Sequence, residues 1–147
     1  MASTDQSSTA PTATPGLTRS RALMVAIAAS VIQMLMLVPG YSEDGSFQVG
    51  EWLVVLAISL VVSVALFLFA VPRGGVIAGI VLGALAVASV LVFWAGITLP
   101  LAAASAALGW RLRRDGDTTA GPVVVLAVAA LAIVAFVAIV VGDAVAN

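Results

Sequence analysis

The chain has 147 residues, of which 63% are hydrophobic and 9% are charged, and its formal net charge is −1. Charged residues make up about 25% of an ordinary soluble domain, so this composition is typical of an integral membrane protein. The chain contains no cysteine and no histidine, which excludes disulfides, thiol chemistry, imidazole bases and the usual zinc sites.

Residues 1–18, with the sequence MASTDQSSTAPTATPGLT, are rich in Ser, Thr, Ala and Pro. Such a segment buries too little apolar area to offset its loss of entropy on ordering, so we predict a disordered cytoplasmic tail. Residues 19–147 are predicted to form a single membrane domain. Its first apolar segment, 22–38, is longer than the ~7–15 apolar residues of a signal peptide and has no A-x-A cleavage site. We therefore favour an uncleaved first span over a signal peptide.

The second apolar segment, 52–71, is long enough to cross a bilayer core, which needs ~20 residues. A polar, acidic loop precedes it and carries Glu43, Asp44 and Glu51. Because Ca²⁺ requires six to eight oxygen ligands in a defined array, these carboxylates favour a solvated loop over a cation site. No metal site is predicted.

The uncharged run from Gly74 to Trp110 poses the main problem of topology. As one helix it would extend about 55 Å, whereas the hydrocarbon core is ~30 Å thick. We therefore predict two spans, 75–95 and 97–110, that meet at Gly96 and form a short hairpin. After the polar connector RLRRDGDTTAGP, a fifth span is predicted at 123–141.

The distribution of arginine supports this all-α, five-span membrane bundle. Cytoplasmic loops carry the excess of basic residues. With five spans and a cytoplasmic N-terminus, all six basic residues face the cytoplasm: Arg19, Arg21, Arg73, Arg111, Arg113 and Arg114. The aromatic residues fit the same topology, with Tyr41, Trp52, Phe93 and Trp94 near the outer interface and Trp110 near the inner one. The predicted location is the cytoplasmic membrane, with the C-terminus outside.

Small residues recur at helical spacing in the third and fourth spans. The third span has Gly75, Gly79, Gly83 and Ala86, and the fourth has Ala102, Ser105, Ala106 and Gly109. In lipid, such stripes allow helices to approach closely. They predict either a tight hairpin between these two spans or a contact surface for a homo-oligomer or a larger membrane complex.

Polar residues also occur at membrane depth. Ser30 and Gln33 share one face of the first span, Ser59 and Ser63 share one face of the second, and Ser89 lies in the third. We expect a hydrogen bond between Gln33 and Ser59, which would contribute about 0.6 kcal/mol and at most about 2. These residues predict structural contacts or, alternatively, the lining of a solute path. No predicted span contains an ionisable residue, which disfavours a proton-coupled transporter.

The stretch GVIAGIVLGALAVASVLVFWAGITLPLAAASAALGWRLRRDG, residues 75–116, resembles uncharacterised small multi-pass membrane proteins of high-GC Gram-positive bacteria. The shared pattern is a Gly/Ala-rich span followed by a short second span that ends in a Leu-Gly step and an Arg cluster. The resemblance implies a small accessory membrane protein, and it carries no catalytic or cofactor residue onto this chain.

The sequence therefore predicts a non-catalytic structural or accessory subunit that packs in the membrane through its small-residue helix faces. The alternative is a small transporter or channel-like protein for an uncharged solute. Enzymatic activity is not expected, because a serine nucleophile needs a neighbouring base and the spans supply neither histidine nor lysine. The expected partners are the lipid bilayer and either a larger membrane complex or further copies of the chain, with no cofactor and no nucleic acid.

Overall fold

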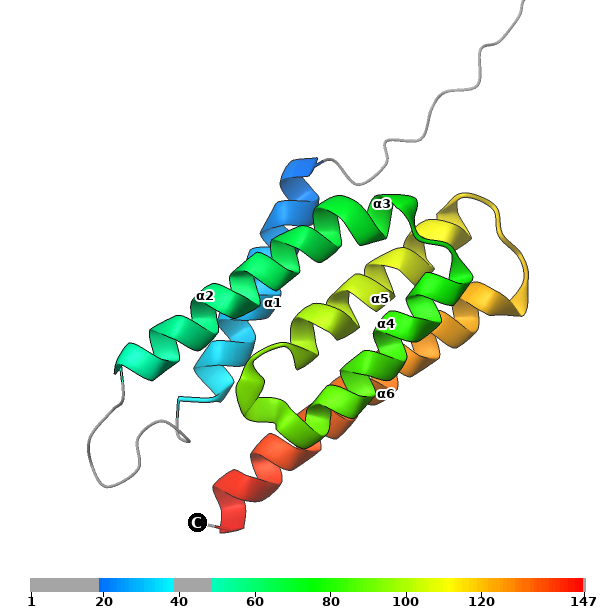
Figure 1. Ribbon diagram of the computed structural model, residues 1–147. Helices are drawn as coiled ribbons and strands as arrows, with labels where there is room; N and C mark the ends of the chain where they lie inside the picture. The colour runs from blue at the N-terminus through cyan, green and yellow to red at the C-terminus, as the bar shows by residue number, and fades with distance from the viewer. Residues whose placement is uncertain (1–18, 39–48, 147) are drawn as a thin grey trace, which may run out of the picture.

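The computed structural model describes residues 19–38 and 49–146, apart from the side chains of residues 19, 93–95 and 144, and these residues form a bundle of five helices (Figure 1). No strand occurs in these ranges. Two helices are continuous α-helices of ordinary form near the two ends of the chain, α1 (Arg19–Met36) and α6 (Ala120–Ala146). The helix α5 (Thr98–Arg114) follows the Gly96 turn. The all-α prediction is confirmed.

The other two helices change their winding near one end. The second is α2 (Val49–Ala65), followed without a break by the π-helical η3 (Leu66–Ala70) and by α3 (Val71–Arg73). The next is α4 (Val76–Ser89), which continues into the 3₁₀ segment η4 (Val90–Ala95). Figure 1 shows consecutive helices running in opposite directions.

Helix α5 lies at the centre of the bundle. It packs against α1, α2, α4 and α6, while α1 pairs with α2 and α4 pairs with α6 (Figure 1). Its buried residues extend along the whole helix: Thr98, Pro100, Leu101, Ala102, Ala104, Ser105, Leu108 and Gly109. Most of these side chains are small, so the four surrounding helices can approach the central one closely.

Proline explains the unusual winding near the end of the second helix. Pro72 has no N–H, so the carbonyl of Leu68 loses its usual helical donor. The N–H of Val71 instead donates to the carbonyl of Leu66, which is a π-type bond, and Arg73 Nη1 reaches the Leu68 carbonyl at 3.5 Å. The helix then ends at the extended Gly74. The three segments therefore form one continuous apolar helix, Val49–Arg73.

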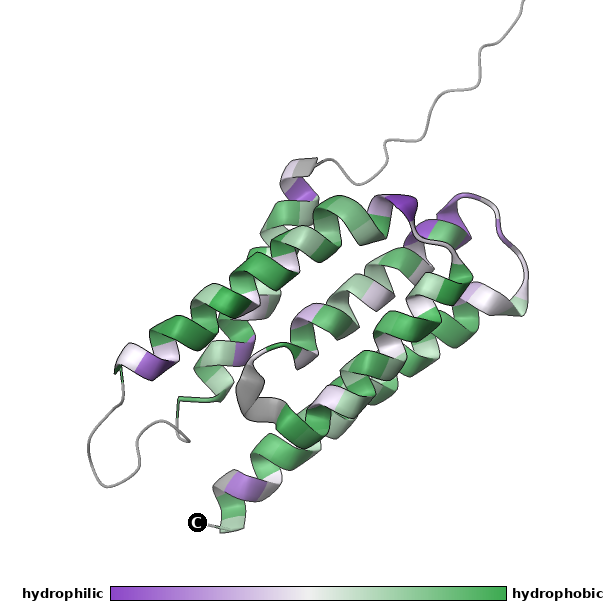
Figure 2. Cartoon of the chain, in the orientation of Figure 1, coloured by the Kyte–Doolittle hydropathy of each residue, from purple (hydrophilic) through white to green (hydrophobic). Residues whose placement is uncertain are grey.

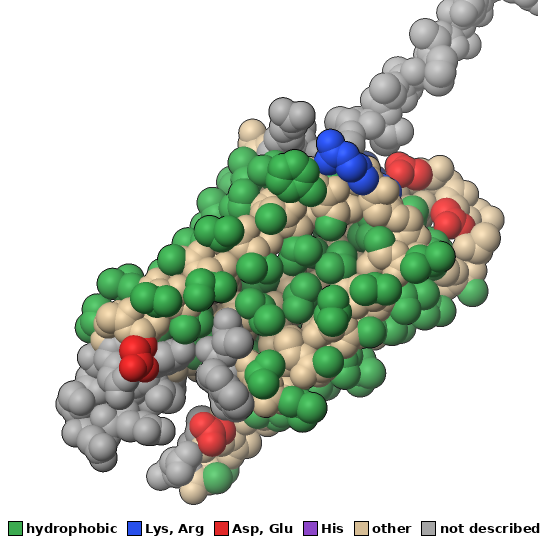
Figure 3. Space-filling view, in the orientation of Figure 1, with side chains coloured by type: hydrophobic (Ala, Val, Ile, Leu, Met, Phe, Trp, Pro, Cys, Tyr) green, Lys and Arg blue, Asp and Glu red, His purple; other side chains and the backbone are tan. Residues whose placement is uncertain are grey.

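The outer faces of the helices are apolar. Figure 2 shows hydrophilic residues concentrated at the helix ends, and Figure 3 shows aliphatic and aromatic side chains over most of the visible face. Within the described residues, two helices are long and apolar enough to cross a membrane, Val49–Arg73 and Ala120–Asp143. Only 22% of the most apolar window of each is buried within the bundle. Their length and composition fit a membrane location.

The run from Gly74 to Trp110 forms two helices that meet at Gly96, as predicted. Gly96 has φ +70°, a left-handed conformation that few residues other than glycine adopt, and the two helices join there. A Cβ at this position would lie 2.8 Å from Val55 Cγ1 and 3.1 Å from Met34 Sδ, so the turn packs tightly against α1 and α2. The predicted tail 1–18 and most of the acidic loop, including Tyr41, Glu43 and Asp44, lie outside the described residues.

Candidate functional site

The polar residues of α1 and α2 meet in the interior of the bundle. Ser30 Oγ and Ser63 Oγ are 2.7 Å apart, and Ser30 Oγ also lies 3.2 Å from the carbonyl oxygen of Ala26 and 3.3 Å from that of Ser59. Ser30, Ser59 and Ser63 are fully buried. Ser59 Oγ has no hydrogen-bond partner in the described part of the chain. This serine cluster joins the two helices at mid-length.

The expected hydrogen bond between Gln33 and Ser59 does not form, and that prediction was wrong. Gln33 Oε1 instead accepts a hydrogen bond of 2.7 Å from the backbone N–H of Leu99. Leu99 lies in the first turn of α5, where backbone N–H groups have no partner within the helix. The amide side chain of α1 therefore caps the start of the central helix, and the pairing with α2 falls to Ser30, one turn earlier.

A second polar contact holds the two sides of the Gly96 turn together. Ser89 Oγ donates to the Ala86 carbonyl at 2.8 Å and approaches Thr98 Oγ1 at 3.0 Å, and Thr98 Oγ1 lies 3.2 Å from the Ser89 carbonyl. This contact joins the end of α4 to the start of α5. Each polar group satisfied in this way avoids the cost of an unpaired group away from water.

The small-residue stripe of α4 lies mostly inside the bundle. Gly79, Gly83 and Ala86 are buried, and the Ser105 hydroxyl donates to the Gly79 carbonyl at 2.8 Å. The expected hairpin between α4 and α5 is therefore present. The atoms closest to the two glycines come from α6, however. A Cβ at Gly79 would lie 2.7 Å from Val125 Cγ1, and a Cβ at Gly83 would lie 2.7 Å from Val128 Cγ1.

This packing leaves little of the stripe free as a contact surface for another protein. Helix α6 already covers Gly79 and Gly83, and only Gly75, at the exposed end of the stripe, has open space around it. In α5, Ala102 is fully buried and Ala106 is half-buried. Gly109 packs against Val125, Leu126 and the Pro122 carbonyl of α6 rather than against α4. The sequence signal for close packing was correct, and the expected contact with α5 is present, but the atoms nearest to Gly79 and Gly83 belong to α6.

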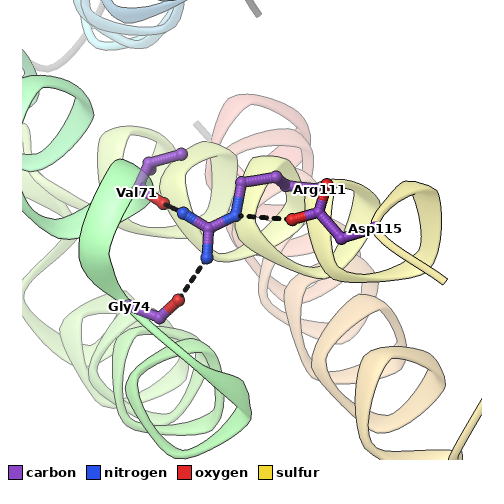
Figure 4. A network of polar contacts seen from close by, with 4 residues as sticks. All are labelled: Val71, Gly74, Arg111 and Asp115. Carbon is purple, nitrogen blue, oxygen red and sulfur yellow. Dashed lines mark hydrogen bonds and ion pairs between the residues drawn. The ribbon is translucent and has the colours of Figure 1, made fainter. Parts of the chain in front are cut away.

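Arg111 ties the end of α5 to the end of α3 (Figure 4). Its Nη1 donates to the Val71 carbonyl and its Nη2 donates to the Gly74 carbonyl at 2.5 Å. Its Nε faces Asp115 Oδ2 at 3.6 Å, one helical turn further along α5. The last carbonyls of a helix have no partners within it, so this guanidinium acts as a cap supplied by a neighbouring helix. The central helix is thus fixed at both ends, by Gln33 and by Arg111.

The connector between α5 and α6 has its own local order. Asp117 Oδ1 accepts a bond of 2.6 Å from the hydroxyl of Thr119 and one of 2.9 Å from its backbone N–H. These two bonds lower the pKa of Asp117 below its ordinary value of 3.8, the hydroxyl having the larger effect. The N–H of Gly121 donates in turn to Thr119 Oγ1 at 3.3 Å, which places Thr119 as the N-cap of α6.

A shallow groove of about 250 Å³ opens between α1, α5 and α6. Every side chain that lines it is aliphatic or a thioether: Ala29, Ile32, Met36, Leu99, Ala103, Ile133 and Val137. It offers no polar group that could orient a polar substrate. Within the described ranges, no three carboxylates come together as a metal site would require, and the hypothesis of a cation at Glu43 and Asp44 concerns residues outside them.

Comparison with protein-family models, with curated proteins and with solved structures gave no match to this chain. The arrangement has to be interpreted from its own residues, and these form four sets of contacts. The serine cluster joins α1 to α2, Ser89 and Thr98 join α4 to α5, the small residues pack α4 against α5 and α6, and Gln33 and Arg111 cap helices other than their own. All four hold helices together, and none presents a nucleophile beside a base.

Proposed function

We propose that the chain is a small integral membrane protein of five spans that acts, without catalysis, as a structural or accessory subunit of the cytoplasmic membrane. The observation that carries the proposal is the separation of side chains by polarity. Large apolar side chains are exposed along the middle of the helices, whereas the polar side chains at the same depth are buried. Such an arrangement suits a hydrocarbon solvent and is unfavourable in water.

The capping of α5 supports the same proposal. In hydrocarbon, an unsatisfied N–H or carbonyl costs several kcal/mol, so only structures that satisfy their backbone internally span a membrane. At about 26 Å, α5 is shorter than the ~30 Å hydrocarbon core, so at least one of its ends would lie in or close to lipid. Gln33 supplies a partner for the backbone at the start of α5, and beside its other end Arg111 supplies partners for the carbonyls of Val71 and Gly74.

The proposed orientation places the N-terminus in the cytoplasm and the C-terminus outside. The arginines with described side chains lie at one end of the bundle, where α1 begins and where α3 and α5 end: Arg21, Arg73, Arg111, Arg113 and Arg114. Glu51 and Asp143 lie at the other end, where α2 begins and α6 finishes. Because basic residues are retained on the cytoplasmic side, the arginine end is assigned to the cytoplasm.

The surface that would meet a protein partner is no longer the glycine stripe, which α6 covers. The outward faces of α2 and α6 remain, with exposed residues such as Val54, Val61, Leu131 and Val134. An accessory role is favoured over solute transport because, apart from the Ser59 hydroxyl, the polar groups proposed for a solute path are engaged in contacts between helices. Ser30 and Ser63 pair with each other, and Gln33 accepts from α5.

The test is co-purification of the full-length chain with a C-terminal tag in a mild detergent, followed by identification of stoichiometric partners. A defined membrane complex would support the accessory role. Recovery as a lone monomer or homo-oligomer would count against a larger complex. In that case solute flux in proteoliposomes should be compared between the natural chain and a Gln33→Leu, Ser63→Ala variant, since a transporter would lose flux in the variant.

A further inference from the structure

Two neighbouring helices end in the same pair of residue types. Phe69 and Arg73 lie four residues apart at the end of the second helix, and Trp110 and Arg114 lie four residues apart at the end of α5. Residues at this spacing stack on one face of a helix. Both aromatic residues are exposed, Phe69 to 64% and Trp110 to 59%, and both arginines are exposed as well.

The Arg111 cap sets the two pairs at the same depth. Arg111 bonds the carbonyls of Val71 and Gly74, so this point of α5 lies beside the end of α3. On α5, Trp110 comes one residue before Arg111 and Arg114 comes three residues after it. On the neighbouring helix, Phe69 comes two residues before Val71 and Arg73 comes two residues after it. Both helices run toward the same end of the bundle (Figure 1). In the membrane placement proposed above, the aromatic rings therefore lie toward the bilayer and the guanidinium groups toward the cytoplasm.

Among the described residues, the carboxylates at this end are already engaged, and none of them pairs with the arginines of the two pairs. Asp115 faces Arg111, and Asp117 accepts from Thr119. Within the described residues, the guanidinium of Arg73 lies 5.8 Å from the centre of the Phe69 ring, and its hydrogen bond goes to a backbone carbonyl. Figure 3 shows a basic patch at the surface of this end, with acidic side chains beside it. An exposed guanidinium presents several donors in a geometry that matches phosphate oxygens.

We propose that the Phe69/Arg73 and Trp110/Arg114 pairs form a site for the headgroup of an anionic phospholipid in the cytoplasmic leaflet. The aromatic rings lie at the level where tryptophan and other aromatic residues favour the membrane interface, and the guanidinium groups reach the phosphates beyond it. The basic end thereby binds lipid in addition to setting the topology. This inference rests on the membrane placement proposed above, and its ligand is independent of any protein partner.

The test uses full-length protein purified in a mild detergent, in which the orientation in a bilayer has no influence. Native mass spectrometry measures retention of dioleoyl-phosphatidylglycerol against dioleoyl-phosphatidylcholine, which have the same acyl chains. The site variant is Arg73→Gln with Arg114→Gln. The matched control is Arg21→Gln with Arg113→Gln, which removes the same charge from the same end without touching either pair.

The natural chain should prefer the anionic lipid, and the site variant should lose that preference roughly tenfold or more, since each arginine near an anionic surface contributes about fivefold. The control should lose much less, and glycerol phosphate at equal concentration should not displace the lipid. The single variants Arg73→Gln and Arg114→Gln replace the double one if it loses its helical circular dichroism.

Three results would overturn the proposal: no preference in the natural chain, an equal loss in site and control variants, or displacement by glycerol phosphate. Extraction of the protein from membranes by alkaline carbonate would instead refute the membrane placement itself. The two failures are therefore distinguishable.

Discussion

At the scale of single residues, the packing of α4 against α6 depends on the lack of a side chain at Gly79. A Cβ there would lie 2.7 and 2.8 Å from the two γ-carbons of Val125, and valine has little freedom to rotate away within a helix. Gly142 is a matched helical glycine in α6 with nothing within 4 Å. The two positions therefore separate the effect of crowding from that of helix propensity.

We expect Gly79→Ala to lower the free energy of unfolding by about 1–2 kcal/mol, because overpacking costs about 1–3 kcal/mol and alanine's higher helix propensity offsets part of it. Gly142→Ala should be neutral or slightly stabilising. Thermal unfolding in detergent, followed by circular dichroism, gives both values. Adding Val125→Ala to Gly79→Ala should relieve the crowding. A stabilised Gly79→Ala protein would contradict the close approach of α4 and α6.

Asp117 provides a prediction about pH. Its pKa is lower in the folded protein than its ordinary value of 3.8, because the Thr119 hydroxyl and N–H bond the charged carboxylate. The folded state therefore holds this proton less tightly than the unfolded state. The resulting stabilisation is present above about pH 4 and is lost as the pH falls through the folded pKa.

The variant Asp117→Asn keeps the oxygen that accepts these bonds but does not titrate. We expect the melting temperature of the natural chain to fall more between pH 6 and pH 3 than that of the variant, by a small amount because the carboxylate is exposed to solvent. The other carboxylates titrate in both proteins and cancel in the comparison. Parallel pH profiles would show that the Asp117–Thr119 contact does not persist in solution.

At the scale of secondary structure elements, the end of α3 depends on a side chain of another helix. Arg111 leaves the central helix to cap α3, and it is 29% exposed, so its bonds are only partly screened by solvent. We expect Arg111→Gln to destabilise the protein by about 2 kcal/mol, in the range for hydrogen bonds to a charged group. Exposed Arg113, two residues further on, is the control, and Arg113→Gln should change stability by less than about 0.5 kcal/mol.

Hydrogen exchange identifies the element that responds to the loss of this cap. In Arg111→Gln, the amides at the end of the second helix, from Phe69 to Gly74, should exchange faster, while those of α6 should change little. This pattern would follow from release of the α3 carbonyls. A uniform acceleration over the whole bundle would instead show that Arg111 supports the fold as a whole and not this one contact.

The sequence predicted the elements better than their partners. Hydrophobic length and the glycine at position 96 were enough to locate five helices and the break in the long apolar run. The expected contact of Gly79 with α5 is present, but its close approach to α6 was not predictable, because a small residue shows that something comes close and does not identify it. Gln33 was likewise paired with Ser59 because the two residues were expected at the same depth. It bonds the backbone N–H of Leu99 instead, and this donor is available only because α5 begins there. Arg111 was interpreted only as part of the cytoplasmic arginine cluster. Its capping role could not be inferred from the sequence, because it depends on where the Val71 and Gly74 carbonyls lie in space.

At the scale of the whole molecule, the five-span proposal makes α6 cross the bilayer from the cytoplasm to the outside. Its 27 residues extend about 40 Å, enough to cross the hydrocarbon core and both boundaries. Thr118, just before α6, and Val145, near its end, are both exposed, and neither takes part in a polar contact described above. The natural chain contains no cysteine, so a single cysteine at either position is the only thiol in the protein.

In intact cells treated with a membrane-impermeant thiol reagent, Val145→Cys should be labelled and Thr118→Cys should be protected. Thr118→Cys should become reactive once the membrane is permeabilised, which controls for burial of the thiol. The reverse pattern would keep the span but invert the orientation, so the arginine end would face outward against the usual charge bias. Labelling of both positions in intact cells would show that α6 does not cross the membrane. The five-span topology, which places all six arginines in the cytoplasm, would then be wrong.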